Sequence, residues 1–253
     1  MSEPRRGSYL WTALAVVYLI PATLVLASAA ILLSWVPPRG NLMCALARVW
    51  SRGLLWVAGV RVEAEIPPTV AAGKGFVYLA NHQSYFDIPA LLSILPGTLR
   101  FAAKRSLFLI PVFGWALWAG GFIPVDRRDR SKAREVYRAA SQRLHSGASV
   151  LFFPEGTRSP DGRVGTFERG GFLVALKAGA AIVPVGVQGT RDVLPRDSWR
   201  IQPGTVRLRL GEPIAVADYG LRRKGELVTA VREKVLDLSA EASALEDEPA
   251  TGS

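Results

Sequence analysis

The stretch that decides the fold runs from residue 75 to residue 95 and reads GFVYLANHQSYFDIPALLSIL. Phe76–Ala80 is a short apolar run typical of a buried strand, and Asp87–Leu95 has the apolar pattern of a helix. Residues 81–86, which begin with four polar side chains, join the two. A strand, a short polar loop and a helix in this order begin an α/β unit, in which functional side chains gather beyond the carboxyl end of the strand.

Further strands and helices are predicted as far as Leu245. Further strands are predicted at Leu99–Ala103, Phe122–Val125, Val150–Phe153, Ala181–Val187 and Thr205–Leu210, and further helices at Ser131–His145, Gly171–Ala178 and Gly225–Leu245. Strands separated by helices favour an α/β domain with a mostly parallel sheet flanked by helices.

The N-terminal segment is predicted to be helical and embedded in a membrane. Tyr9–Val36 contains no charged residue, and a helix of that span is about 42 Å long, against about 30 Å for the hydrocarbon core of a bilayer. Pro21 divides the run into two halves. Two geometries remain open, a single tilted helix that spans the membrane and a hairpin that enters and returns, and we favour the hairpin. Arginines flank both ends of the run, so the positive-inside rule gives no orientation.

A second helix is predicted over Leu42–Val57. Arg48 and Arg52 lie four residues apart and share one face, and tryptophans stand beside them. This pattern is typical of an interfacial helix on anionic lipid, and it fits an amphipathic helix packed on the domain equally well.

The composition restricts the partners. The formal net charge is +10 and the pI is near 10.2, which favours an anionic partner: nucleic acid, an acidic membrane surface or a phosphorylated substrate. Cys44 is the one cysteine, so no disulfide can form within the chain. With two histidines and no Cys/His cluster in the sequence, a metal site is not expected.

The first motif is the pair His82 and Asp87, five residues apart. The loop can fold the carboxylate of Asp87 back onto the imidazole of His82, which fixes the tautomer of the ring and stabilises the imidazolium. His82 is therefore a candidate general base, and Asp87 its orienting partner. An aspartate that caps a helix beside a surface histidine explains the same spacing about equally well.

The second motif follows the strand that ends at Phe153 and reads Pro154-Glu-Gly-Thr-Arg-Ser159. Gly156 permits a tight turn, Arg158 offers a planar fork suited to phosphate, and Thr157 can add a hydrogen bond. Glu155 fits such a site if it orients Arg158 or a substrate hydroxyl. A plain turn with a surface arginine is the alternative.

In this order, four segments resemble the glycerolipid acyltransferase family, in particular its 1-acylglycerol-3-phosphate acyltransferases: Asn81–Asp87, Phe122–Arg127, Phe153–Ser159 and Val183–Val185. The resemblance implies that His82 is the catalytic base and Asp87 its partner. It also implies that the phosphate or glycerol of the substrate is bound by Lys104, Arg127, Glu155, Gly156, Thr157 and Arg158.

The same resemblance implies the reaction. An acyl group would pass from an acyl thioester, carried by coenzyme A or acyl carrier protein, to the sn-2 hydroxyl of 1-acylglycerol 3-phosphate, giving phosphatidic acid. No cofactor or metal is expected, since the thioester is a co-substrate. Anionic membrane lipids are expected partners, and the cytoplasmic face of a bacterial inner membrane the expected location.

Two other functions are compatible with the sequence. One is acyl transfer to another lysolipid, such as a lyso-ornithine lipid, and the other is a non-catalytic basic protein of the membrane surface. The uncharged N-terminal run argues against a nucleic-acid partner. The predicted organisation is a membrane anchor with an interfacial helix over residues 1–62, an acyltransferase domain over 63–245 and a disordered acidic tail over 246–253.

Overall fold

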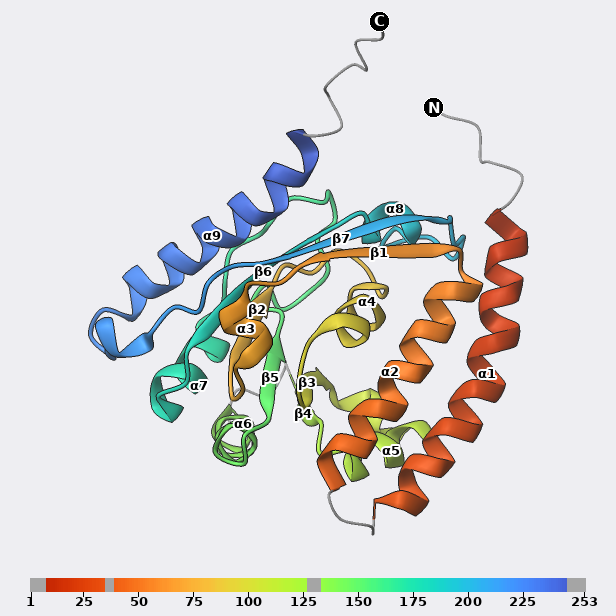
Figure 1. The fold of residues 1–253 in the computed structure, drawn as a ribbon, viewed down its shortest axis with the longest axis horizontal. Coiled ribbons are helices and arrows are strands. Elements are labelled where there is room, and N and C mark those ends of the chain that lie inside the picture. Colours follow the sequence, from red (N-terminus) through yellow and green to blue (C-terminus); the bar gives the residue numbers. More distant parts are fainter. Residues whose placement is uncertain (1–7, 35–38, 127–132, 245–253) are drawn as a thin grey trace, which may run out of the picture.

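A seven-stranded sheet forms the centre of the computed structural model, which describes residues 8–34, 39–126 and 133–244 (Figure 1). The strand order is β1-β7-β6-β2-β5-β3-β4. The strands are β1 (Val60–Glu65), β2 (Val77–Ala80), β3 (Leu99–Lys104), β4 (Ile123–Val125), β5 (Ser149–Phe152), β6 (Ile182–Gln188) and β7 (Gly204–Leu210). Neighbouring strands are parallel except β6 and β7. The predicted α/β fold with a mostly parallel sheet is therefore confirmed.

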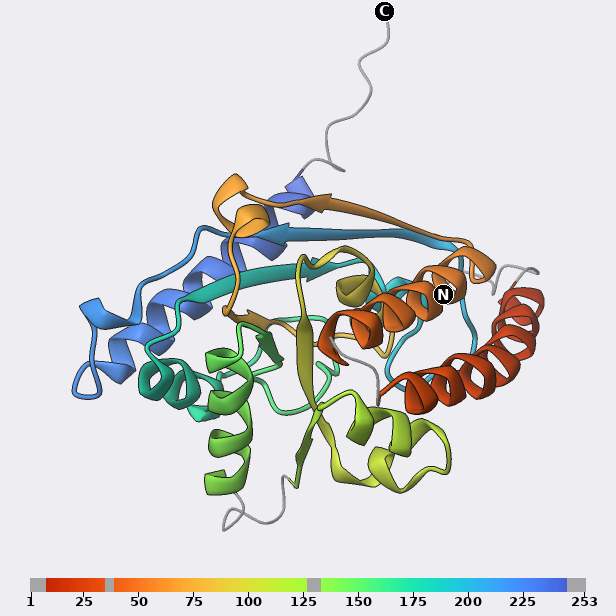
Figure 2. The ribbon, with the colours of Figure 1, turned by 60° about the horizontal axis from the view of Figure 1, so that its bottom comes forward.

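Helices cover both faces of the sheet (Figures 1 and 2). One face is covered by α1 (Ser8–Leu33), α2 (Arg39–Val57), α4 (Asp87–Ile94) and α5 (Phe113–Ala119), and the other by α6 (Ala133–His145), α7 (Gly170–Ala178) and α9 (Lys224–Ala244). Short helical turns complete the chain: α3 (Pro68–Ala72), η1 (Arg105–Leu109), α8 (Thr190–Val193) and η3 (Val216–Asp218).

Strand β2 is buried on both faces of the sheet, which explains why its sequence is continuously apolar and does not alternate with polar residues. Tyr78 and Ala80 pack in the core with α2 and α4, whereas Val77 and Leu79 pack on the opposite face with α6, α7 and α9. All four side chains are at most 1% exposed. A strand buried on both faces is the expected reading of a continuous apolar run in a parallel sheet.

The predicted hairpin at Pro21 is wrong. Helix α1 continues unbroken from Ser8 to Leu33 with Pro21 inside it. An internal proline removes one backbone hydrogen bond, which long apolar helices tolerate. Within the described part of the chain, Tyr9–Leu33 is the one helix long and apolar enough to cross a membrane, with a mean hydropathy of 2.4.

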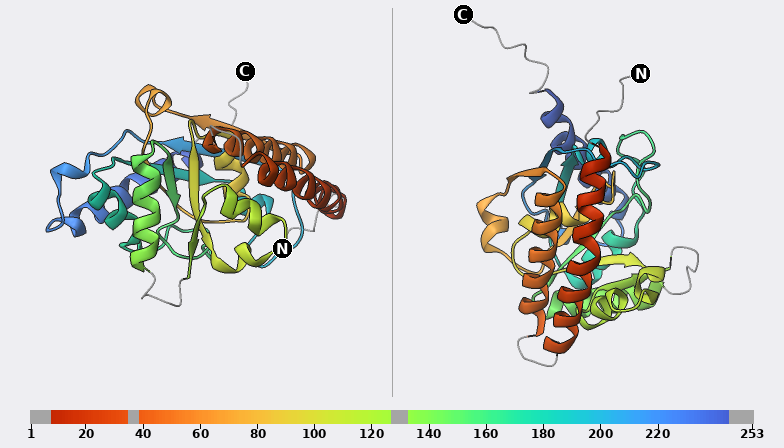
Figure 3. Two further views of the ribbon diagram at one scale, coloured as in Figure 1. Left: turned by 90° about the horizontal axis from the view of Figure 1, so that it is seen from below. Right: turned by 90° about the vertical axis from the view of Figure 1, so that its right-hand side faces the viewer.

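Helix α2 runs beside α1 (Figures 1 and 3) and packs on α4. The Tyr18 hydroxyl donates to the Trp50 carbonyl at 3.1 Å, and the Trp50 indole donates to Thr23 Oγ1 at 3.0 Å. Arg48 and Arg52 both turn to the domain: Arg48 donates to the carbonyls of residues 95 and 97, and Arg52 to that of residue 93. The carbonyls at the end of α4 need such donors, and the two arginines supply them.

Strand β1 was not predicted from the sequence. It pairs with β7 from Val60 to Glu65, so the domain boundary predicted between residues 62 and 63 falls inside it. On its exposed side Glu63 pairs with Arg207 at 3.3 Å and Glu65 with Arg209 at 3.0 Å. The predicted disordered tail, 246–253, lies outside the described residues.

Candidate active site

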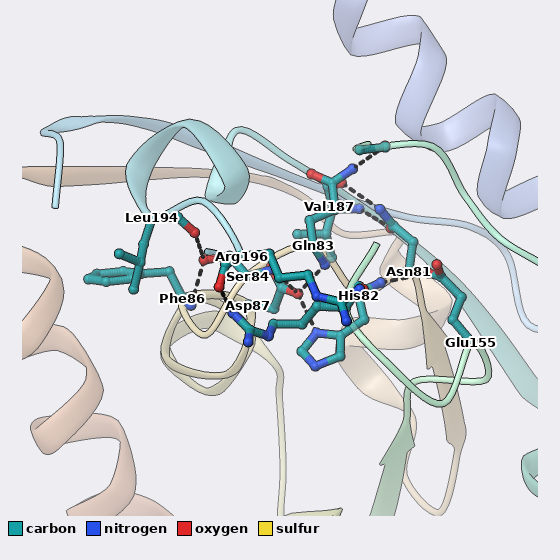
Figure 4. A network of polar contacts seen from close by, with 12 residues as sticks. Asn81, His82, Gln83, Ser84, Phe86, Asp87, Glu155, Val187, Leu194 and Arg196 are labelled. Carbon is teal, nitrogen blue, oxygen red and sulfur yellow. Dashed lines mark hydrogen bonds and ion pairs between the residues drawn. The ribbon is translucent and has the colours of Figure 1, made fainter. Parts of the chain in front are cut away.

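Three loops meet at the carboxyl ends of the adjacent strands β6, β2 and β5 (Figure 4). The loop after β2 begins with Asn81, whose side chain continues the sheet pairing beyond the strand. Its Nδ2 donates to the Val187 carbonyl at 2.8 Å, and its Oδ1 accepts from the Val187 amide at 2.7 Å. This pairing fixes the point from which His82 leaves the sheet.

His82 and Asp87 form the pair that the sequence predicts. The distance from His82 Nδ1 to Asp87 Oδ2 is 2.6 Å. Asp87 is fully buried in the first turn of α4, and Oδ2 also accepts from the amides of Gln83 and Ser84 at 2.7 and 3.0 Å. A carboxylate held in this way orients the imidazole and leaves Nε2 to accept or donate a proton.

The main chain of His82 is fastened to the loop after β5. Its amide donates to Glu155 Oε1 at 2.8 Å, and its carbonyl accepts from the Ser159 amide at 2.7 Å. The imidazole stacks on Phe153, with ring centroids 4.0 Å apart. The backbone and the ring of His82 are therefore both fixed before any substrate binds.

Glu155 connects two backbone segments. Its second oxygen, Oε2, accepts from the Gly165 amide at 3.1 Å, so each carboxylate oxygen has one amide donor. Burial raises the pKa of Glu155, and the two amide hydrogen bonds oppose this shift. A contact of Glu155 with substrate stays a prediction, while the geometry gives this residue a role in positioning His82.

Residues 156–158 of the second motif are half-buried or exposed. Gly156 has φ 71°, a left-handed conformation that favours glycine, and Thr157 is exposed. Arg158 is half-buried, with its guanidinium carbon 3.8 Å from the centroid of the Tyr85 ring. Arg158 therefore lies against the loop that carries His82.

Two other predicted residues stand further out. Lys104 is exposed at the end of β3, and β5 separates β3 from the strand that leads to His82. Both strands end at the same edge of the sheet, but no hydrogen bond or ion pair joins Lys104 to His82 or Arg158 in the described part of the chain. Arg127 lies outside the described residues.

A cavity of about 620 Å³ opens beside Phe153, the residue that stacks on His82. Its walls combine the ends of β3 and β5 with α6 and the beginning of α7, including Ala103, Phe152, Val136 and Gly170. The lining is apolar along the strands and polar near Arg169. Among the residues that the structure describes, no cluster of His, Cys, Asp and Glu could hold a metal ion.

Sequence reasoning missed the contacts that join the loops. Ser84 Oγ donates to the Leu194 carbonyl at 2.7 Å, and Gln83 Nε2 donates to the Gly162 carbonyl at 3.0 Å. Arg196, in the loop after β6, was also missed, although a basic residue soon after the strand 182–188 could have indicated a binding residue at that end of the sheet. Arg158 Nη1 donates to the Arg196 carbonyl at 3.1 Å. These three pairs of partners lie about 40 to 110 positions apart in the sequence, and the fold alone brings them together.

Comparison with known proteins places the chain in a family. The model of the Acyltransferase family matches residues 61–188. The chain is 33% identical over 202 residues to the 1-acyl-sn-glycerol-3-phosphate acyltransferase of Pseudomonas aeruginosa, covering 78% of this chain and 77% of the relative. It is 44% identical over 139 residues to a chloroplastic 1-acyl-sn-glycerol-3-phosphate acyltransferase of Arabidopsis thaliana, covering 54% of this chain and only 39% of that relative.

A solved structure agrees with this assignment over nearly the whole chain. The 1-acyl-sn-glycerophosphate (LPA) acyltransferase from Thermotoga maritima superposes with a TM-score of 0.81 at 27% identity, covering 94% of this chain and 96% of that one. The match of sequence and of fold, together with the four sequence blocks, shows that the chain belongs to the Acyltransferase family.

Proposed function

We propose that this protein transfers an acyl group from an acyl thioester to the sn-2 hydroxyl of 1-acylglycerol 3-phosphate and so makes phosphatidic acid. The contact of 2.6 Å between His82 and the buried Asp87 carries this proposal. The pair supplies the one group that the reaction needs, a base that takes a proton from an alcohol as the alcohol attacks.

The reaction then proceeds without a protein nucleophile. His82 Nε2 accepts the hydroxyl proton while the hydroxyl oxygen attacks the thioester carbonyl carbon, and Asp87 stabilises the imidazolium. The tetrahedral intermediate collapses, the carbon–sulfur bond breaks, and the departing sulfur takes the proton from Nε2. Histidine and aspartate thereby return to their starting states.

The acceptor is assigned by charge and by relatives. Arg158, beside the histidine loop, presents a guanidinium suited to a phosphate monoester. The relatives from Pseudomonas aeruginosa and Escherichia coli are both named 1-acyl-sn-glycerol-3-phosphate acyltransferases. Phosphate binding near His82 would bring the sn-2 hydroxyl to the base, which is the proximity contribution to catalysis.

The lipid setting follows from α1. Its exposed apolar side chains, such as Val17 and Val25, would lie in a membrane that holds both acceptor and product. We propose the cytoplasmic face of the membrane, where acyl-coenzyme A and acyl carrier protein are made. Either carrier satisfies the chemistry.

The test uses membranes that contain the protein, radiolabelled oleoyl-coenzyme A and a panel of acceptors. We expect labelled phosphatidic acid from 1-acylglycerol 3-phosphate, and little product from monoacylglycerol, lysophosphatidylcholine or a lyso-ornithine lipid. A parallel series with oleoyl-acyl carrier protein identifies the donor. Product from another acceptor alone, with both donors, would contradict the assigned substrate.

A further inference from the structure

The loop after β6 (residues 189–203) brings a second arginine to the active site. Nη1 of Arg196 donates to the carbonyl of Arg158 at 2.8 Å, and Nη1 of Arg158 donates to the carbonyl of Arg196 at 3.1 Å. We call Arg158 and Arg196 the arginine pair. Figure 4 shows Arg196 in the same cluster as His82 and Asp87.

The two loops that carry the pair both contact the segment 82–87, at positions one and two residues away from the arginines. Ser159, which follows Arg158, donates its amide to the His82 carbonyl. On the other side, the Leu194 carbonyl, two positions before Arg196, accepts from Ser84 Oγ. The loops that carry the two arginines are therefore both fastened to the segment 82–87, which fixes the pair relative to the base.

Among the described residues, no carboxylate balances the charges of the pair. Both side chains are half-buried, and no described carboxylate forms an ion pair with either guanidinium. Each guanidinium commits one nitrogen to a carbonyl, which leaves N–H donors on the others. Two neighbouring cations with spare donors are stabilised by an anion between them, and phosphate matches the planar fork of arginine.

The loop after β6 is also fastened to the membrane helix. The Ile201 amide donates to Thr12 Oγ1 at 2.9 Å, Thr12 Oγ1 donates to the Trp199 carbonyl at 3.3 Å, and the Arg200 guanidinium contacts the Tyr9 hydroxyl. Trp199 is 84% exposed. Arg196 therefore lies on a segment that is attached to α1.

We propose that Arg196 binds the phosphate of the lysolipid acceptor jointly with Arg158. This inference rests on the proposed function, because it assigns a second phosphate-binding residue to the acceptor site of that reaction. Arg158 alone would give one charged contact with the acceptor. The pair would favour a phosphate monoester, because its charge and three free oxygens can bind both guanidinium groups.

The kinetic test compares Arg196→Gln with wild type and with Arg191→Gln. Arg191 is a matched control, because it also joins the loop after β6 to the loop after β5, by a hydrogen bond of 2.9 Å to the Pro160 carbonyl. We expect Arg196→Gln to raise the KM for 1-acylglycerol 3-phosphate by about tenfold to a hundredfold, the loss expected for charge-assisted hydrogen bonds. The KM for the acyl donor and the values for Arg191→Gln should stay near wild type.

A structural role for Arg196 predicts a different result. It would lower the Tm and kcat of Arg196→Gln and affect both KM values alike. Arg196→Lys separates the two roles further, since lysine keeps the charge without the fork and should recover part of the acceptor affinity. An acceptor KM in Arg196→Gln equal to that of Arg191→Gln would overturn the proposal.

A binding experiment tests this inference separately from the reaction. Calorimetry on the full chain in detergent measures the affinity for soluble hexanoyl-lysophosphatidic acid and for inorganic phosphate. We expect tighter binding of the lysolipid, weakened in Arg196→Gln and not in Arg191→Gln. Binding of this kind without phosphatidic acid formation would support the pair and reject the reaction. Phosphatidic acid formation, together with unchanged binding of the lysolipid in Arg196→Gln, would support the reaction and reject the arginine pair. If the protein binds inorganic phosphate as tightly as the lysolipid, the pair is a site for free phosphate and not for the lipid headgroup.

Discussion

At the scale of single residues, the Oδ2 atom of Asp87 organises the loop that follows β2. It accepts hydrogen bonds from the imidazole of His82 and from the amides of Gln83 and Ser84, while Oδ1 is buried without a partner among the described residues. Every one of these donors lies within five positions of Asp87. A pattern this local can be predicted from sequence, which is why the histidine and aspartate could be identified together.

Glu155 shows the opposite case. Its partner, the amide of His82, lies 73 positions away, and only the parallel pairing of β2 with β5 brings the two together. The sequence could identify Glu155 as part of a motif that resembles a family block. It could not predict that the carboxylate binds backbone amides, because that depends on the register of two strands.

The half-buried carboxyl group of Glu155 predicts a pH dependence of stability. Burial raises its pKa above the usual 4.5, so the folded state holds the proton more readily than the unfolded state. Wild type therefore loses stability as the pH rises from 4.5 through the raised pKa, and Glu155→Gln does not lose this contribution. When Tm is measured as a function of pH, the Tm of Glu155→Gln should rise relative to that of wild type across that interval. If the Tm of Glu155→Gln does not rise relative to that of wild type across this pH interval, the raised pKa of Glu155 is not the cause of the pH dependence.

At the scale of elements, most of the sheet could be predicted because its strands are short apolar runs. The ends of the elements predicted from Phe76 onward lie within two residues of those observed. Strand β1 was missed although Val60, Val62 and Ala64 alternate with charged residues, a readable signal of an edge strand. The course of α1 past Pro21 could not be predicted, since it depends on packing against α2.

The packing of α9 on β6 depends on a glycine. A Cβ on Gly186 would lie 2.6 Å from the carbonyl carbon of Leu238 and 2.8 Å from its oxygen, so the backbone of α9 would have to shift. We expect Gly186→Ala to destabilise the protein by about 1–3 kcal/mol and to lower its Tm by several degrees. Gly225→Ala, in the same helix with open space around the position, serves as control. Equal Tm values for the two variants would show that α9 does not pack closely at Gly186.

At the scale of the whole molecule, the candidate active site and the apolar helix α1 are joined by direct contacts. Helix α1 contacts the loop after β6 through Tyr9 and Thr12 and packs along α2, which in turn packs on α4 behind Asp87. The sequence predicted an apolar anchor and a separate domain. It gave no indication that the anchor is joined to the active-site loops, because those contacts connect positions about 190 residues apart.

Attachment to the membrane is expected to depend on the exposed side of α1. Val17 and Val25 are 70% and 66% exposed, and an arginine costs about 2.5–3.5 kcal/mol at the centre of a membrane helix. The double variant Val17→Arg, Val25→Arg should move into the soluble fraction after a carbonate wash. Leu221→Arg adds a charge at another exposed apolar residue and should stay with the membrane. Retention of the double variant equal to that of Leu221→Arg would exclude this face from the lipid.

The most direct test of the central claim is the rate of acyl transfer in His82→Ala. The control is His145→Ala, because His145 is the other histidine of the chain and lies exposed at the end of α6. With radiolabelled donor and 1-acylglycerol 3-phosphate, we expect His82→Ala to lose about 10²–10⁴-fold in kcat, the usual contribution of general base catalysis, while His145→Ala matches wild type. Equal rates in both variants would show that His82 is not the base.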